Sequence, residues 1–489
     1  MGGSWQAAST SEPRCRAAAI ERAGRDRNRG QAPRGAPGSP CAASAGYGGQ
    51  SGKMIGVEQK GASLGESVVR ERCAAEVSRW KVRGRRVLLI APDHTRTAPI
   101  GLMFRVLHAL IAPEASAFDV LIALGTHPPM TEDAIQERFA MTSEDRNTVF
   151  ARTNFYNHRW DDPQQLVSIG TIAEEDVASI SGGLMHEKVD VTINRLALEY
   201  DLLLILGPTF PHEVVGFSGG NKYLFPGISG KEIIDMFHWL GALLTNAAII
   251  GTKHTPVRAI VDRAAAMVPT ERKCASLIID GSAFVGLYLG TPEEAWNAAA
   301  DLSSRLHVVR TDRPYASVLS CAPRMYDELW VGGKCAYKLE PVVVDGGELI
   351  IYAPHISRFS ITHGKMIERI GYHVRDYFLA QMERFADVPR GVMAHATHVK
   401  GAGTYVDGVE RPRIQVTLAT GLSEDQCQAV NLGYRDWRTI RPEDWSHREH
   451  DGRLYVAKAG ETLYRLRSSA TPDRNDLSAA WTPTQVHEE

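Results

Sequence analysis

Three short polar groups follow apolar runs of the chain, and their side chains suit proton transfer and anion binding. The groups are Asp93-His94-Thr95-Arg96, Gly125-Thr126-His127 and Pro211-His212. Imidazole titrates near neutral pH and can both take and return a proton, and a guanidinium binds a carboxylate through two hydrogen bonds. A single histidine behind a strand is more often a loop residue with a satisfied hydrogen bond. Three such groups favour a site, because ligands bind where the carboxyl ends of parallel strands meet.

The densest cluster of functional residue types lies between His212 and Gly227, where several familiar motifs fail. A zincin motif would need a second histidine at Gly216. A Walker A loop would need Gly-Lys-Ser/Thr, but Asn221 separates the preceding glycine from Lys222. Glycines at this density are typical of a loop whose backbone N–H groups approach an anion such as a phosphate.

One motif is matched in form, because residues 216–220 (Gly-Phe-Ser-Gly-Gly) fit the Gly-x-Ser-x-Gly nucleophile elbow. That elbow requires an apolar strand directly before it and a helix directly after it. Pro211 and Pro226 flank the segment instead. A serine hydrolase that uses Ser218 is therefore the alternative interpretation.

Taken together, these groups resemble the nickel-dependent lactate racemase family. The resemblance rests on DHTR from Asp93, GTH up to His127, the compound pattern PH-x-x-x-GFSGG-x-K-x-x-x-PGI from Pro211, and His238, which follows Lys222 by sixteen residues. It is looser further along the chain. There the family has Tyr-Gln-x-x-Lys, whereas residues 330–334 read Trp-Val-Gly-Gly-Lys.

The resemblance implies a nickel-pincer nucleotide, a pyridinium-3,5-bisthiocarboxylic acid mononucleotide whose two sulfurs and one ring carbon bind nickel. Lys222 matches the lysine that carries this cofactor through a thioamide, and a tethering amine must be deprotonated, hence partly desolvated or close to other cations. His238 matches the fourth nickel ligand. His127 and His212 match two catalytic bases, one for each enantiomer of a 2-hydroxy acid. The C2 hydrogen leaves as hydride, and the flat 2-keto acid can receive it on either face.

The remaining assignments concern the substrate and the nucleotide. Arg96 and Lys334 are candidates for the substrate carboxylate, with a structural ion pair as the alternative. The candidates for the ribose and phosphate of the cofactor are Asp93, Thr95, Ser218, Gly219 and Gly220.

The substrate itself stays open, because Val331 stands where the family has Gln. Lactate is one possible substrate. Polar and aromatic side chains near Lys334 could bind a larger or sugar-derived hydroxy acid, namely those of Asp327, Glu328, Trp330 and Tyr337. The sequence thus predicts a 2-hydroxyacid racemase or epimerase that depends on cofactor-assembly enzymes. A non-catalytic sensor of a nucleotide or hydroxy acid is a further alternative.

Apolar runs place these residues on a sheet. Four continuous runs, at 87–94, 118–127, 201–212 and 275–281, alternate with helix signals such as Thr131-Glu-Asp and Thr291-Pro-Glu-Glu. Continuous rather than alternating apolar strands are buried on both faces, as in parallel sheets. Further runs at 316–323 and 346–357 begin a second α/β unit. The fold prediction is therefore two α/β domains with mainly parallel sheets, residues 61–307 and 308–468, and an active site in the cleft between them.

The ends of the chain differ from this pattern. Residues 1–53 are rich in Ala, Gly, Ser and Pro and contain Ile20 but no Leu or Val, so the predicted leader (residues 1–60) is disordered. An over-extended gene start with Met54 as the true initiator is preferred over a transit peptide. The tail at 469–489 is polar.

Composition excludes several functional classes. A net charge of −2 over 489 residues argues against binding to nucleic acid or anionic membranes. The longest apolar run is far shorter than the roughly 18–20 residues of a membrane span. Seven cysteines without paired spacing predict neither a disulfide framework nor a zinc site, and the expected location is the cytoplasm.

Overall fold

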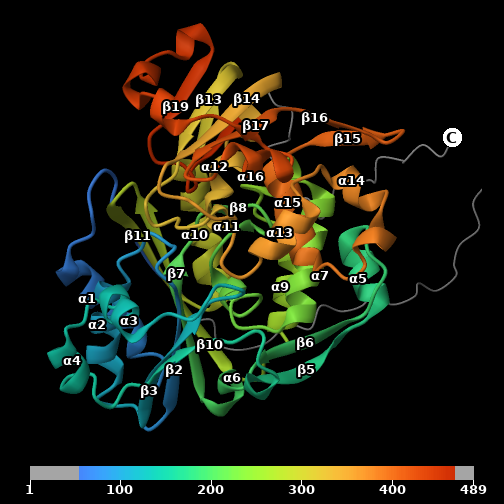
Figure 1. Cartoon of the computed structure of the whole chain (residues 1–489). Helices are drawn as coiled ribbons and strands as arrows, with labels where there is room; N and C mark the ends of the chain where they lie inside the picture. The colour runs from blue at the N-terminus through green and yellow to red at the C-terminus, as the bar shows by residue number, and fades with distance from the viewer. Residues whose placement is uncertain (1–53, 468–489) are drawn as a thin grey trace, which may run out of the picture. The chain divides into compact units, whose positions relative to one another are not determined.

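A seven-stranded sheet forms the core of the first half of the described chain (Figure 1). Its order is β1-β11-β10-β7-β2-β3-β4, and all neighbours from β10 to β4 are parallel. The strands are β1 (Ile55–Glu58), β2 (Arg86–Pro92), β3 (Ala117–Ala123), β4 (Phe155–Asn157), β7 (Leu202–Pro208), β10 (Glu271–Asp280) and β11 (Ala283–Gly290). The prediction of a mainly parallel α/β sheet is confirmed.

The structure, a computed structural model, describes residues 54–467. The predicted leader up to residue 53 and the predicted tail at 469–489 therefore lie outside the described residues. Residues 55–58 were predicted to belong to the leader, but they form β1, which pairs antiparallel with β11. The prediction missed this short edge strand because its backbone pairing is with residues more than 200 positions away.

Helices cover both faces of the large sheet, as its continuous apolar strands require. Along β2, Leu88 and Ile90 face one core, and Val87 and Leu89 face the other. The second core is closed by α1 (Glu66–Val77), α2 (Ile100–Ile111) and α3 (Glu132–Arg138). The first is closed by α7 (Lys231–Leu244), α9 (Pro256–Ala265) and α10 (Pro292–His307).

Two predicted helix starts are confirmed by their caps. The hydroxyl of Thr131 accepts a hydrogen bond from the Ala134 N–H at the start of α3. Thr291 and Glu294 form a reciprocal capping box at the start of α10. Such side-chain acceptors satisfy N–H groups that have no partner inside the helix.

The strand order creates a switch point between β2 and β7. From β2 the chain continues to β3 and β4 on one side, and it then returns to β7 on the other side of β2. Loops that leave neighbouring strands in opposite directions open a crevice at their carboxyl ends, which is where ligands bind in open α/β sheets. The polar groups that follow β2, β3 and β7 therefore border one crevice.

A second, five-stranded sheet lies in the later part of the chain and is parallel throughout. Its order is β18-β17-β14-β13-β19. The strands are β13 (Tyr315–Cys321), β14 (Val343–Ala353), β17 (Gln415–Thr420), β18 (Gly433–Tyr434) and β19 (Arg453–Val456). The helices around it include α11 (Leu329–Gly332), α12 (Lys334–Tyr337), α13 (Gly364–Ile370), α14 (Arg375–Leu379), α15 (Arg390–Lys400) and α16 (Glu424–Ala429).

One buried cluster joins the two sheets, because α15 packs against α7 (Figure 1) and apolar side chains of both halves are in continuous contact. The predicted boundary near residue 308 falls on β12 (Val308–Thr311), which pairs with β20 (Leu463–Leu466) and with neither large sheet. The division into two domains stays a prediction. Smaller elements are α4 (Ser143–Asn147), β5 (Leu166–Ile172), α5 (Glu174–Ser181), β6 (Val189–Asn194), α6 (Leu196–Glu199), α8 (Asn246–Ile249), β15 (Gly403–Val406) and β16 (Val409–Pro412).

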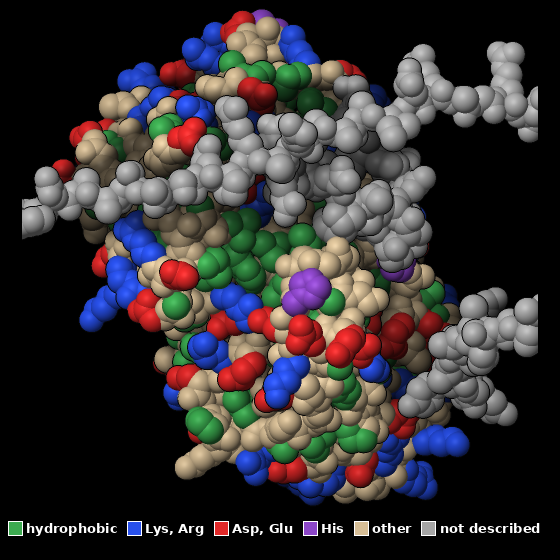
Figure 2. All heavy atoms as spheres, turned by 90° about the vertical axis from the view of Figure 1, so that its right-hand side faces the viewer, with side chains coloured by type: hydrophobic (Ala, Val, Ile, Leu, Met, Phe, Trp, Pro, Cys, Tyr) green, Lys and Arg blue, Asp and Glu red, His purple; other side chains and the backbone are tan. Residues whose placement is uncertain are grey.

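The composition of the described residues agrees with these elements. None of their helices is long and apolar enough to cross a membrane. The cysteines described are unpaired and buried, namely Cys73, Cys274, Cys321, Cys335 and Cys427. On the face drawn in Figure 2, side chains of both charge signs are interspersed, in keeping with the near-zero net charge.

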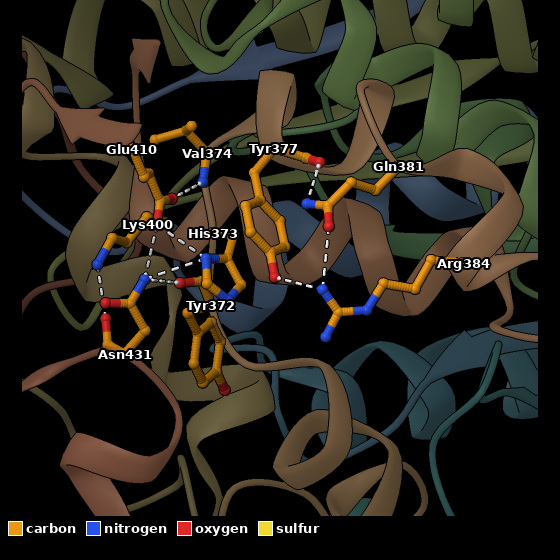
Figure 3. Close-up of polar contacts among 9 residues, drawn as sticks. All are labelled: Tyr372, His373, Val374, Tyr377, Gln381, Arg384, Lys400, Glu410 and Asn431. Carbon is orange, nitrogen blue, oxygen red and sulfur yellow. Dashed lines mark hydrogen bonds and ion pairs between the residues drawn. The ribbon is translucent and has the colours of Figure 1, made fainter. Parts of the chain in front are cut away.

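A polar network attaches the β15–β16 hairpin to the segment before α14 (Figure 3). The Glu410 carboxylate on β16 accepts hydrogen bonds from the Val374 N–H at 2.7 Å, from His373 Nδ1 at 2.8 Å and from Asn431 Nδ2 at 2.8 Å. The His373 ring also stacks on Tyr377 with the ring centroids 3.7 Å apart. One carboxylate thus holds three donors from two segments.

Glu410→Ala should destabilise the protein by about 1–3 kcal/mol, because it leaves these donors without their charged acceptor. Urea or thermal unfolding of the purified protein measures this loss. The matched control is Glu137→Ala, which removes an exposed carboxylate from helix α3. Equal stability of the two variants would show that the network holds the hairpin only weakly.

Candidate active site

A single cavity at the carboxyl ends of β2, β3 and β7 brings together most of the predicted site residues. The predicted residues that line it are Asp93, Arg96, His127, His212, Ser218, Lys222, His238 and Lys334. Its wall is completed by residues of α11 and α12 in the second half of the chain, including Trp330, Val331 and Tyr337. Thr95, Gly219 and Gly220, which were also predicted to belong to the site, are not among the residues that line this cavity, although Thr95 is hydrogen-bonded to Asp93 and Arg96.

Asp93 and His127 form a hydrogen-bonded pair. Nδ1 of His127 lies 2.5 Å from Oδ2 of Asp93, and because an ionised carboxylate only accepts, Nδ1 carries the proton. Burial would raise the pKa of Asp93, but the His127 ring, Arg96 and the Thr95 hydroxyl outweigh it and hold this pKa well below its usual range. In the neutral form of this ring, the lone pair that a general base requires is on Nε2.

Arg96 is held by the residue before it. Its Nη1 donates to the Thr95 hydroxyl at 2.6 Å and to the Thr95 carbonyl at 3.2 Å, and the same hydroxyl donates to Oδ1 of Asp93 at 2.6 Å. No other side-chain hydrogen bond of Arg96 is present within residues 54–467, so its Nε and Nη2 groups remain for an anion in the cavity. Thr95 thus orients the guanidinium.

His212 has a different arrangement from His127. It ends β8 (Pro211–His212), and its Nδ1 accepts a hydrogen bond from the Val214 N–H at 3.1 Å. Oε2 of Glu213 lies 3.5 Å from the same nitrogen. Burial lowers the pKa of His212 well below its usual value, and the cations Lys222, Arg96 and Lys338 act in the same direction against Glu213. The ring is therefore neutral, with its proton on Nε2.

The glycine-rich loop is held tightly from behind. Arg258 on α9 donates to the carbonyls of Phe217 and Gly219, and the indole N–H of Trp296 donates to the Ser218 carbonyl at 2.9 Å. Arg258 stacks on the Trp296 ring at 4.1 Å. A Cβ at Gly216 would lie 1.8 Å from the Thr252 carbonyl oxygen. This packing presents Ser218 and Lys222 to the cavity.

Lys222 lies in the short 3-10 helix Gly220–Tyr223 that follows the loop. Burial, together with the positive charges of Arg96 and Arg258, lowers the pKa of the Lys222 amine to about 7. A substantial fraction of this amine is therefore uncharged at neutral pH, which is the form that can act as a nucleophile.

His238 projects from α7 with its ring stacked on Phe237, the centroids 5.0 Å apart. Its Nδ1 donates to the Ile234 carbonyl at 2.6 Å, which leaves the Nε2 lone pair free. Metal-binding histidines are commonly oriented by such a hydrogen bond from the other ring nitrogen. Among residues 54–467, no group of three or more His, Cys, Asp or Glu side chains is placed to hold a metal. A metal at His238 would need donors from another molecule.

The geometry does not support Ser218 as a nucleophile. Its hydroxyl accepts from the Phe210 N–H at 2.9 Å and donates to the Pro208 carbonyl at 3.2 Å. A catalytic serine must pass its proton to a base, whereas Ser218 donates to a backbone carbonyl. The hydroxyl closes the loop onto the end of β7.

The second half of the chain contributes a flat wall. The Trp330 ring lies against His395 and His363, with centroids 4.1 and 4.6 Å away. Burial lowers the pKa of His395 to about 3 and that of His363 to about 4, so both rings are neutral. Asp327 and Glu328 do not line the cavity, and Glu328 accepts a hydrogen bond from the Ile361 N–H.

Lys334 is buried and faces the Tyr326 ring at 5.0 Å. Burial and the nearby Arg96 lower its pKa well below the usual value for lysine, although Glu213 opposes this. An anion bound in the cavity would supply the counter-charge that a protonated Lys334 lacks. The contact of Lys334 with a substrate carboxylate stays a prediction.

Two residues that contribute to the site, Glu213 and Arg258, were not predicted from the sequence. Glu213 was visible beside His212, but nothing in the sequence shows that its carboxylate turns back to that ring. Arg258 belongs to the first turn of an amphipathic helix, where a buried arginine has no local signature. Both act through contacts that exist only in the folded chain.

The sequence model of the lactate racemase N-terminal domain matches residues 53–251. Lactate racemase from Lactiplantibacillus plantarum is 31% identical over 155 residues, and that from Thermoanaerobacterium thermosaccharolyticum is 33% identical over 150 residues. A crystal structure of a protein from Thermotoga maritima has a TM-score of 0.78 and 33% identity, covering 84% of this chain and 100% of that one. Residues 53–251 thus resemble the N-terminal domain of lactate racemase.

Two of these likenesses are partial. The matched segments take in 31% and 30% of this chain but only 32% and 31% of the two curated lactate racemases. The lactate racemase apoprotein structure from Thermoanaerobacterium thermosaccharolyticum has a TM-score of 0.63 and 20% identity, covering 83% of this chain and 94% of that one, which supports the fold alone. The family match ends at residue 251, so it includes His238 but not Lys334.

The reactivity of Lys222 should rise through neutral pH. Its neutral fraction increases as the pH passes about 7, so competitive labelling of the protein with acetic anhydride should reach half of its maximal rate near that pH. Peptide mass spectrometry compares Lys222 with the exposed Lys365 in the same sample. A labelling rate that still climbs steeply above pH 9 at Lys222 would contradict a depressed pKa.

Proposed function

We propose that the protein is a racemase or C2-epimerase of a 2-hydroxy acid that works with a nickel-pincer nucleotide tethered to Lys222. The observation that carries this proposal is the meeting of four side chains in one cavity, those of His127, His212, Lys222 and His238. The similarity of residues 53–251 to the lactate racemase N-terminal domain supports the same reaction class. A serine hydrolase would require a free hydroxyl at Ser218, which its backbone hydrogen bonds do not leave.

The residues present fit this cofactor. Lys222 offers a partly uncharged amine for a covalent link, and His238 offers one imidazole nitrogen. The described residues hold no complete metal site of their own, which suits a cofactor that brings three of the four nickel donors. A square-planar site with one imidazole is ordinary nickel coordination. Ser218 lines the cavity beside Lys222, so the glycine-rich loop would be the part of the chain nearest to the ribose and phosphate of the tethered cofactor.

When bound, the cofactor would supply a hydride acceptor for the C2 hydrogen of the substrate. The chain's own residues would do the rest. Arg96 binds the substrate carboxylate through its unused donors, and Lys334 completes the ion pair. Nε2 of His127 takes the hydroxyl proton of one enantiomer while Asp93 holds Nδ1. His212 serves the mirror enantiomer from another wall of the cavity.

The residues of the cavity restrict the type of reaction more than they restrict the substrate. Val331 lines the cavity where family members carry Gln, which removes one polar contact. The Trp330 face beside it is flat and backed by neutral rings. We infer that the group attached to C2 lies against this wall, and that a 2-hydroxy acid with a larger uncharged side chain, such as a sugar-derived acid, is accommodated there as well as lactate.

The two-base assignment predicts different defects for different enantiomers. In cofactor-loaded protein, His127→Ala and His212→Ala should each stall racemisation, since loss of a general base costs about 10²–10⁴-fold in rate. Each variant should still oxidise the enantiomer whose hydroxyl faces the remaining histidine. Pre-steady-state spectra with each pure enantiomer measure this, and C2-deuterated substrate identifies the hydride step.

The outcomes separate the interpretations. Equal impairment of both enantiomers in both variants would overturn the two-base assignment. Absence of an adduct on Lys222 after co-expression with cofactor-assembly enzymes, together with ester hydrolysis, would support the serine hydrolase instead. Binding of a hydroxy acid without turnover in loaded protein would support a sensor.

The nickel assignment is tested by a second variant. His238→Ala should lower the nickel content of co-expressed protein while the mass of the Lys222 adduct persists, because only one donor is removed. Elemental analysis and intact mass spectrometry measure the two quantities, with the exposed His186→Ala as the matched control. Full nickel content in His238→Ala would remove this histidine from the coordination sphere.

A further inference from the structure

The Glu213 carboxylate borders the cavity with one of its oxygens unpaired. Oε2 is buried and has no hydrogen-bond partner within residues 54–467. An unpaired buried acceptor is costly, so its surroundings point to what it could accept. The nearest ring nitrogen is Nδ1 of His212 at 3.5 Å, slightly too far for a hydrogen bond.

The two candidate bases of the cavity, His127 and His212, are in opposite tautomers. His127 carries its proton on Nδ1, held by Asp93, and presents a lone pair at Nε2. His212 receives the Val214 N–H at Nδ1 and therefore carries its proton on Nε2. A neutral ring in this state can donate from Nε2 but cannot take a proton there. His212 can act as a base only if a proton moves to Nδ1.

We propose that Glu213 is the positioning residue for His212, accepting its Nδ1 proton in the working state as Asp93 does for His127. This inference rests on the proposed function, because it gives His212 the role of a base. A shift of a few tenths of an ångström brings Oε2 within hydrogen-bond distance of Nδ1. The Val214 N–H then gives up its bond to the ring.

The proton balance of the step is simple. With Nδ1–H held by Glu213, Nε2 of His212 uses its lone pair to take the hydroxyl proton of the substrate, and the ring becomes an imidazolium. In the reverse direction the imidazolium returns the Nε2 proton to the carbonyl oxygen of the 2-keto acid, and the N–H electron pair stays on Nε2. Nδ1 keeps its proton throughout, so the proton transfer needs only His212 and the substrate, while the C2 hydrogen would move separately as the hydride that the bound cofactor accepts or returns.

Other charges around His212 make such a partner necessary. Three cations oppose a positive His212 ring, namely Lys222, Arg96 and Lys338. Glu213 favours the positive ring. Glu213 is itself surrounded by Lys334, Lys338 and the Tyr337 hydroxyl. Conversion of the Lys222 amine into an uncharged linkage would remove one of the opposing charges. Attachment of the cofactor to Lys222 would thereby favour protonation of His212.

A purely structural role for Glu213, as a counter-ion of the two lysines, is the rival explanation. Glu461 provides the matched control, because it also acts on Lys338 and its side chain is 15% exposed, as is that of Glu213. Glu461 pairs with Lys458 at 3.6 Å. Glu461→Gln therefore removes a comparable charge without removing a partner of the ring.

The first measurement needs no cofactor. In histidine-¹⁵N-labelled Lys222→Met protein, which lacks the lysine charge, long-range ¹H–¹⁵N NMR reports which nitrogen of His212 is protonated between pH 5 and 8. His212→Gln assigns the signals. We expect Nδ1 to be protonated, and Glu213→Gln to reduce the proton affinity of Nδ1 by about tenfold or more, while Glu461→Gln and the His127 signals stay unchanged. An unprotonated Nδ1 across this range, or equal effects of the two Glu→Gln variants, would overturn the proposal.

The second measurement uses cofactor-loaded protein with each pure enantiomer. Glu213→Gln should slow the enantiomer served by His212 by about 100-fold or more, since a histidine in the wrong tautomer loses its catalytic power. Asp93→Asn should slow the opposite enantiomer. Equal slowing of both enantiomers by Glu213→Gln would assign Glu213 to charge balance alone. If loaded protein oxidises no hydroxy acid, the proposed function fails, whereas the NMR result on Glu213 still stands or falls independently.

Discussion

Charged side chains buried in one cavity must balance each other, and the rest of the site depends on this balance. Asp93 stays ionised because His127 and Arg96 lie beside it, and Glu213 stays ionised because Lys334 and Lys338 lie beside it. Burial alone would neutralise each of these groups. Since the partners come from three different strand ends and from α12, the balance exists only when the second half of the chain is packed against the large sheet. The electrostatics of the site and the packing of the whole molecule are thus one property.

The same balance of charge and burial leaves Lys222 and His238 in chemically reactive states. Lys222 has cations as neighbours, so its amine is partly uncharged. His238 has a backbone acceptor at one nitrogen, so the other is free. Nearby carboxylates oppose the lowering of the pKa values of Lys222 and His238 but do not outweigh burial. These carboxylates are Glu213 and Asp93 for Lys222, and Asp235 for His238. Under the proposed function, a covalent link at Lys222 and a metal at His238 would use these two groups.

Most strands of the large sheet and most residues that line the cavity could be predicted from the sequence, because their signals lie in short stretches of neighbouring residues. The runs that became β2, β3, β7 and β10 are continuously apolar, and Thr131 and Thr291 mark helix starts by their own side chains. Because these strands are parallel, the residues that follow their carboxyl ends lie close together. The tautomer of His212 could not be predicted, because one backbone N–H, that of Val214, decides it. Nor could the place of Arg258 beneath the glycine-rich loop or the pairing of β1, since both depend on contacts between distant segments.

The unequal rigidity of the two cavity walls has a consequence for how such a protein can diversify. On one wall, Gly216 lies against the Thr252 carbonyl, and Gly219 and Gly220 adopt positive φ angles of 90° and 59° with Thr209 and Trp296 close by. Any larger residue there would displace backbone or break the support of Lys222. The opposite wall is made of ordinary side chains on short helices, Trp330 and Val331 among them, whose exchange costs only local repacking. Substitutions on the wall that contains Trp330 and Val331 can therefore change which substrate fits, while the residues of the glycine-rich wall stay the same.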